Sequence, residues 1–165
     1  MNWRETATFP PGPRPADEEM DVIVRAIPAD QRVLMVTTVN RFDYNPSPDI
    51  RGPVVVLTDK ALHFAKRRRP AKMKPDWTYK LEDFEELVYG PFQGVGPAWC
   101  VRFKIVEYGI WHFGMLYFNG PDRAEPIYQE LHKAVRELRA PGTLFKTHVI
   151  EKSAASIECV MRYPF

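Results

Sequence analysis

The chain has 165 residues, of which 45% are hydrophobic and 27% charged, as is usual for one globular domain. Its 23 basic and 21 acidic side chains leave a formal net charge of +2, so bulk charge excludes a general polyanion binder and any electrostatic function requires local clustering. No apolar run predicts a signal peptide or a membrane span, and the two cysteines have no metal-binding spacing, so we expect a cytoplasmic protein without a disulfide framework.

The N-terminal region is predicted to contain a tail and a short helix. Residues 1–15 are rich in proline and lack periodicity, which favours a mobile or draped tail. Acidic residues from Asp17 to Asp21 then suit a helix start, and Met20, Ile23 and Ile27 fall on one face of an amphipathic helix.

Residues 32–118 are predicted to form strands without helices between them. Because strands without helical crossovers pair antiparallel, this order predicts a meander. Asp59-Lys60 marks a tight hairpin, and residues 42–52 are predicted to be a loop because they contain Pro, Asn, Asp and Gly. The seven predicted strands are 32–42, 53–58, 61–66, 77–81, 85–92, 98–106 and 110–118.

A long helix follows the strands. Ile127, Leu131, Val135 and Leu138 form one apolar stripe, and Pro141-Gly142 ends the pattern. We therefore predict a mainly β fold, a seven-stranded antiparallel barrel or sandwich capped by a C-terminal α-helix, with a short N-terminal helix. The predicted divisions are a tail at 1–15, a domain at 16–139 and an extension at 140–165 with one or two more strands.

The strand at 110–118 is apolar on both faces. A strand with one wet face alternates polar and apolar residues, so part of this strand must be covered. The N-terminal helix, the C-terminal tail and another chain are the three alternatives.

Two segments carry a family resemblance. VVVLTDKALHFAKR (54–67) and YKLEDFEELV (79–88), followed by two long strands and a helix, resemble the pleckstrin-homology-like (PH-like) superfamily, in particular GRAM and small bacterial PH-like domains. The resemblance covers about residues 30–139, and Ala61 stands where the family often has arginine. It implies a non-catalytic scaffold that binds acidic lipids or peptides or serves in larger assemblies, and a shared fold does not fix which.

A basic cluster follows the predicted hairpin. In a meander its loop lies beside the loop at 42–52, so we expect eight positive charges on one surface, with Trp77 and Phe42 as interfacial aromatics. The PH-like resemblance implies the same placement, because these two loops commonly frame the lipid site of that superfamily. The predicted residues are Lys66, Arg67, Arg68, Arg69, Lys72, Lys74, Arg41 and Arg51.

The predicted partner of this cluster is an acidic surface. It is either anionic phospholipid, which would place the protein peripherally at the inner membrane face, or an acidic protein. One alternative is a solvated loop without a partner, and another is a structural or homo-oligomeric interaction module whose basic loop is incidental. Nucleic acid is disfavoured because no aromatic platform is interleaved with the charges.

Other titratable residues do not predict an enzyme. His63, His112, His132 and His148 are scattered, and the acidic residues at 82–86 read as a solvated edge. The glycines at 90, 94 and 96 open no helix, so they do not predict a phosphate cradle. We expect no catalytic residue, no metal and no cofactor.

Overall fold

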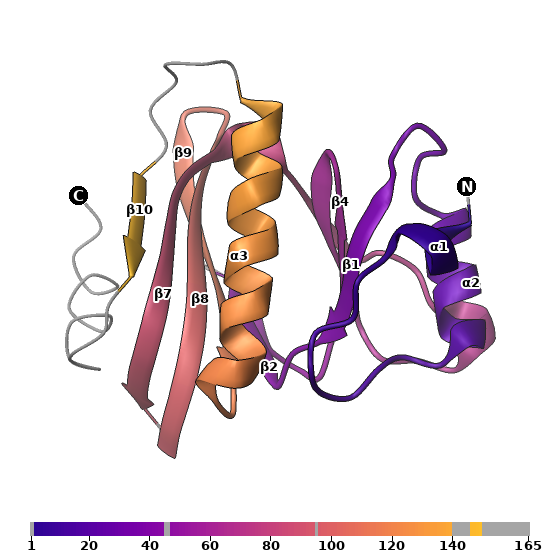
Figure 1. The fold of residues 1–165 in the computed structure, drawn as a ribbon, viewed down its shortest axis with the longest axis horizontal. Helices are drawn as coiled ribbons and strands as arrows, with labels where there is room; N and C mark the ends of the chain where they lie inside the picture. The colour runs from indigo at the N-terminus through magenta and orange to yellow at the C-terminus, as the bar shows by residue number, and fades with distance from the viewer. Residues whose placement is uncertain (1, 45–46, 95, 140–145, 150–165) are drawn as a thin grey trace.

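The computed structural model describes residues 2–44, 47–94, 96–139 and 146–149, which form two β-sheets and three α-helices (Figure 1). The helices are α1 (Trp3–Thr6), α2 (Asp17–Arg25) and α3 (Pro121–Leu138), with short 3-10 turns η1 (Pro70–Lys72) and η2 (Leu81–Asp83). The strands are β1 (Val33–Thr38), β2 (Arg41–Tyr44), β3 (Ser47–Arg51), β4 (Val54–Thr58), β5 (Ala61–Ala65), β6 (Trp77–Lys80), β7 (Phe84–Gly94), β8 (Gly96–Glu107), β9 (Ile110–Phe118) and β10 (Lys146–Val149).

The strands form a four-stranded sheet in the order β1-β4-β5-β6 and a six-stranded sheet in the order β10-β7-β8-β9-β2-β3. All pairs are antiparallel except β10 with β7. The predicted mainly β sandwich with a C-terminal helix and a short N-terminal helix is confirmed. The predicted extension at 140–165 lies outside the described residues except for β10.

The strand predicted at 32–42 is two strands, one in each sheet. The chain leaves β1 after Thr38 and enters the other sheet as β2, where Phe42 is buried inward. The predicted loop at 42–52 was wrong, because β2 and β3 pair as a hairpin in which Arg41 lies opposite Arg51. Proline is tolerated there because β3 is an edge strand of the six-stranded sheet.

The main core lies between the two sheets and α3. The Phe42 ring stacks on the Phe64 ring with centroids 3.9 Å apart, and Leu131 of α3 is fully buried in the same cluster. Gly114 of β9 permits this packing, because a Cβ there would lie 2.1 Å from the Phe103 ring. A substitution at Gly114 would therefore displace a central core side chain.

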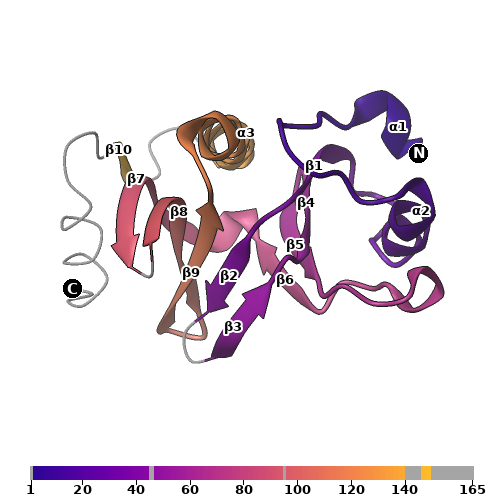
Figure 2. The same ribbon diagram turned by 90° about the horizontal axis from the view of Figure 1, so that it is seen from below.

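The N-terminal tail packs against the four-stranded sheet rather than moving freely. Trp3 of α1 is 4% exposed and lies in a second apolar cluster with Met20 and Ile23 of α2 and Val33 of β1. Figure 2 shows α1 and α2 beside the four-stranded sheet. Of the two states predicted for the tail, the draped one is confirmed, and α1 was not predicted.

The six-stranded sheet is also buried on the face opposite the core. Cys100, Arg102 and Met115 point to that face and are at most 2% exposed. Arg102 forms an ion pair with Glu86 at 2.9 Å, and burial lowers the pKa of its guanidinium. Burial also shifts the pKa of the Cys100 thiol, which it raises because the charged form is the thiolate. Since α1 and α2 pack on the other sheet, the N-terminal helix is not the cover predicted for β9.

Candidate acidic-surface binding site

The basic cluster occupies the connection between β5 and β6, residues 66–76, which we call the basic loop. Hydrogen bonds of one aspartate hold both ends of the loop. The Lys66 backbone N–H donates to Asp76 Oδ2 at 2.7 Å. The Asp76 N–H donates in turn to the Phe64 carbonyl at 2.7 Å. Met73 is 2% exposed in the apolar cluster beneath α2, so the loop is fixed to the domain by a buried side chain.

Arg67 connects the basic loop to α2. Its Nη1 lies 2.9 Å from Glu19 Oε2 and 3.0 Å from Oε1. Glu19 is only 7% exposed, and its carboxylate also accepts the Ala16 backbone N–H at the start of α2. A carboxylate this buried requires a charged partner, so Arg67 compensates a charge inside the protein.

Arg68 pairs within the basic loop. Its two terminal nitrogens donate to the two oxygens of Asp76 at 2.7 and 2.5 Å, which is a bidentate pair. Burial raises the pKa of Asp76, but hydrogen bonds from Arg68 and from the Lys66 backbone outweigh it and leave the pKa below its usual value. Arg68 therefore closes the loop on itself.

The remaining basic side chains of the loop are exposed. Lys66 lies over the Trp77 ring, with Nζ 5.0 Å from the centroid. Arg69, Lys72 and Lys74 are exposed, and none of the described residues forms a hydrogen bond or ion pair with their side chains. We call these three residues the outer cations.

The other predicted site residues lie elsewhere. Arg41 belongs to the six-stranded sheet, where it pairs with Asp43 at 2.5 Å, and this hydrogen bond raises the pKa of the guanidinium. Arg51 lies opposite Arg41 in the neighbouring strand. Figure 2 shows the β2–β3 hairpin and the basic loop extending in different directions. The eight predicted basic residues therefore form two groups.

The two predicted interfacial aromatics differ. Trp77 is half-buried at the end of the basic loop, next to Lys66. Phe42 is fully buried and stacked on Phe64, so its prediction as an interfacial residue was wrong. An apolar side chain in an alternating strand points into the core whenever its polar neighbours point outward, as Arg41 and Asp43 do here.

The sequence did not identify Glu19 or Asp76 as partners of the arginines. Glu19 was one of four acidic residues at a helix start, and only its position four residues before Ile23, on the apolar face, distinguishes it from Glu18, which is exposed. Asp76 offered a weak signal, because an aspartate directly before a strand often accepts backbone hydrogen bonds from its own loop.

His63 lies in a buried polar network on β5. Its Nδ1 is 2.9 Å from Thr78 Oγ1 and its Nε2 is 2.8 Å from Gln31 Oε1. Thr58 Oγ1 also donates to Gln31 Oε1 at 2.8 Å. Burial lowers the pKa of His63 to about 4, so the ring is neutral at physiological pH. These contacts explain His63 as a structural residue.

The remaining titratable residues are dispersed. The His132 ring stacks on Tyr128, and the carboxylate of Glu85 pairs with Lys104 at 3.8 Å. Within the described ranges no three metal-binding side chains gather. No helix there is long and apolar enough to cross a membrane.

Comparisons with known proteins place the fold. No family model and no curated protein matches the chain. A solved structure concerned with the PH and C1 domains of the Vav1 exchange factor matches with a TM-score of 0.50 at 15% identity over 72% of this chain and 32% of that one. The DH/PH domains of p115-RhoGEF match with a TM-score of 0.51 at 9% identity, over 76% of this chain and 43% of that chain.

The chain thus spans less than half the length of these structures. Identities this low carry no information about ligands or partners. The structural similarity bears on the fold alone. The chain has the PH-like fold that its sequence resembles.

Proposed function

We propose that the protein is a non-catalytic PH-like binding module whose outer cations bind an anionic lipid surface. The observation that supports this is the division of the basic loop. Arg67 and Arg68 are engaged by Glu19 and Asp76, whereas Arg69, Lys72 and Lys74 are exposed to solvent. The first two give the loop its shape, and the other three are presented by it.

This division favours a diffuse acidic layer over one specific headgroup. Bidentate recognition of a phosphate is best done by arginine, and the two loop arginines with defined geometry already bind carboxylates. Separate flexible cations instead respond to surface potential, at about 1 kcal/mol each near an anionic leaflet. Three outer cations then contribute about 3 kcal/mol, or about 100-fold in partitioning. Binding of this strength is reversible and weakens with salt.

Several finer assignments remain predictions. Kinship to GRAM and small bacterial PH-like domains rests on the hairpin motif at 54–67. A peripheral position at the inner membrane face follows only if the lipid proposal is correct. An acidic protein is the other surface that three cations would suit, and the experiment below separates the two.

Vesicle co-sedimentation tests the proposal. We expect the full chain to bind vesicles of phosphatidylcholine with 30 mol% phosphatidylserine at low salt, and not phosphatidylcholine alone. Replacing Arg69, Lys72 and Lys74 by alanine should reduce partitioning about 100-fold, since about 3 kcal/mol is removed. A matched control replaces Arg32, Lys133 and Arg136, three other exposed cations, and should retain most of the binding. Absence of binding at low salt, or equal loss in both variants, would overturn the lipid assignment.

A further inference from the structure

The edge of the four-stranded sheet is covered by the chain's own N-terminus. β1 is an edge strand, and edge strands present unpaired N–H and C=O groups. The Thr8 N–H donates to the Leu34 carbonyl at 2.8 Å, and the Val36 N–H donates to the Thr8 carbonyl at 3.0 Å. Residues 7–13, which we call the strap, thus add a one-residue parallel bridge to this edge.

The strap lies between β1 and the N-terminal end of α3, and we call the place that it occupies the groove. Arg123 donates to the Pro11 carbonyl at 3.3 Å and to the Thr38 carbonyl of β1 at 2.7 Å. The Thr38 hydroxyl donates to the Pro13 carbonyl at 2.9 Å. Gly12 has φ +129°, and a Cβ there would lie 2.4 Å from Arg123 Nε. Figure 2 shows this part of the chain between α3 and β1.

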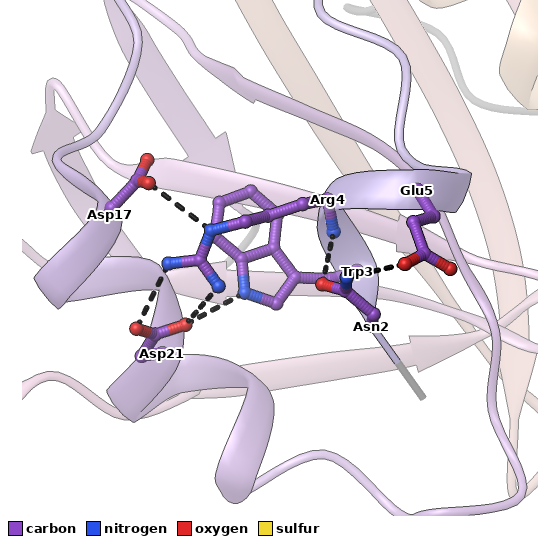
Figure 3. Close-up of polar contacts among 6 residues, drawn as sticks. All are labelled: Asn2, Trp3, Arg4, Glu5, Asp17 and Asp21. Carbon is purple, nitrogen blue, oxygen red and sulfur yellow. Dashed lines mark hydrogen bonds and ion pairs between the residues drawn. The ribbon is translucent and has the colours of Figure 1, made fainter.

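The strap is preceded by an aromatic anchor. Trp3 is 4% exposed, and its indole N–H donates to Asp21 at 2.9 Å (Figure 3). A cavity of about 270 Å³ lies beside it, lined by Val24, Ile27 and Val33 among others. The anchor site therefore has room for a side chain placed differently from Trp3.

Apart from the buried Trp3, the contacts that fix this segment are partly exposed. Arg4 forms ion pairs with Asp17 and Asp21 at 3.2 and 3.0 Å, and the three side chains are between 39% and 66% exposed (Figure 3). Exposed pairs of this kind contribute little to stability. Two backbone hydrogen bonds and one from the Thr8 hydroxyl complete the pairing with β1. Segments held mainly by such exposed contacts open more readily than the core.

We propose that the groove between β1 and α3 is a peptide-docking site that the strap occupies in cis and that an extended segment of another protein occupies when the strap is displaced. The main-chain groups of Leu34 and Val36 bind the partner by strand addition, and Arg123 binds its carbonyls. The partner segment carries an aromatic anchor followed by a proline- and glycine-containing stretch, because that is the chemistry the groove accepts in cis. This inference is independent of the lipid proposal, since the residues involved differ.

Tethering explains why the intact chain should bind such a peptide weakly. A segment attached through a short linker has a millimolar effective concentration at its own site. The apparent affinity for a peptide in trans falls by the fraction of molecules whose groove is open. Weakening the strap should therefore strengthen binding in trans.

The probe is a fluorescein-labelled peptide of residues 2–15, measured by fluorescence anisotropy with the full-length protein. The variant Trp3→Ala/Thr8→Pro loses the anchor and the Thr8 N–H, and we expect it to bind at least tenfold more tightly than the unmodified chain. Adding Arg123→Ala to that variant should weaken binding at least fivefold. A peptide with the same composition in scrambled order is the negative control.

Several outcomes would overturn the proposal. These are equal affinity for the unmodified chain and the strap variant, no binding by a variant that still melts cooperatively, or binding that Arg123→Ala does not change. If Trp3→Ala/Thr8→Pro fails to fold, Arg4→Ala removes the exposed ion pairs and the contact of the guanidinium with the Trp3 ring, and it should bind about threefold more tightly. A dimer of the unmodified chain that the peptide disperses would assign the groove to a second copy and overturn the assignment to another protein.

Discussion

The two halves of the basic loop use the same side-chain chemistry in opposite ways. In the inner half, Arg67 and Arg68 bind carboxylates of the protein, one of them on α2. In the outer half, Arg69, Lys72 and Lys74 have no such partner among the described residues. The difference shows that the number of charges in a loop overestimates the charge available to a ligand. It also predicts that the inner half affects stability and the outer half binding.

The largest expected effect on stability comes from β5, the strand that leads into the basic loop, and not from the loop itself. His63 of β5 has a pKa of about 4 when folded and about 6.5 when unfolded, so the unfolded chain binds more protons between these values. Its contribution to stability is complete above pH 6.5 and is lost as the pH falls to 4, about 3 kcal/mol in all. Urea denaturation from pH 4 to 7 measures this.

His63→Gln should flatten most of that slope. His132 provides the control, because burial also lowers its pKa and His132→Gln should remove only a smaller part. If the slope survives in His63→Gln, the network around Gln31 is not its source. The ion pair between Arg68 and Asp76 should remain intact over this range, because the pKa of Asp76 lies below its ordinary value.

The second-largest effect is expected from a substitution that breaks the link between the basic loop and α2. Arg67→Ala leaves the buried Glu19 carboxylate without its charged partner, which costs several kcal/mol when a pair is fully buried. Since Arg67 is 42% exposed, we expect a reduced loss of about 2 kcal/mol in urea denaturation. Arg69→Ala in the outer half is the matched control and should change stability by less than about 0.5 kcal/mol.

A second substitution checks the cause. Glu19→Gln in the Arg67→Ala background removes the unpaired charge and should restore part of the loss. Equal destabilisation by Arg67→Ala and Arg69→Ala would remove the distinction between the two halves.

The smallest effect concerns the closure of the basic loop. Arg68→Ala removes a bidentate pair, but Asp76 keeps the hydrogen bond from the Lys66 backbone, so we expect a loss of about 1 kcal/mol. Thermal denaturation measures it. Arg68→Lys keeps the charge without the bidentate geometry and should recover about half. Full recovery by lysine would show that charge alone matters at this position.

The fold was largely predictable because its apolar strand segments are separated by turn residues. The stretch at 98–118 reads as two long strands, and both are present as β8 and β9. The β2–β3 hairpin could not be predicted, because Pro46 and Pro48 resemble loop residues and only an edge position makes Pro48 acceptable in a strand. Whether that region forms strands depends on the pairing of β2 with β9, which is a long-range contact.

The sequence predicts which residues make up the basic loop, but not which of them pair with carboxylates of the protein. The run from Lys66 to Lys74 shows that a basic loop exists. Which arginine meets a carboxylate depends on how α2 packs over the loop, and Glu19 is far from Arg67 in sequence. The strap was missed for a similar reason, since a single bridge at Thr8 leaves no periodic pattern.

The buried thiol of Cys100 can be used to measure how often the six-stranded sheet opens. A thiol with no exposure and a raised pKa reacts with alkylating reagents only when the packing around it opens. In a variant with Cys159 replaced by serine, the rate of modification would report how often the surroundings of Cys100 on β8 open. Comparing that rate with the rate of global unfolding would show whether this sheet opens alone or only with the whole domain.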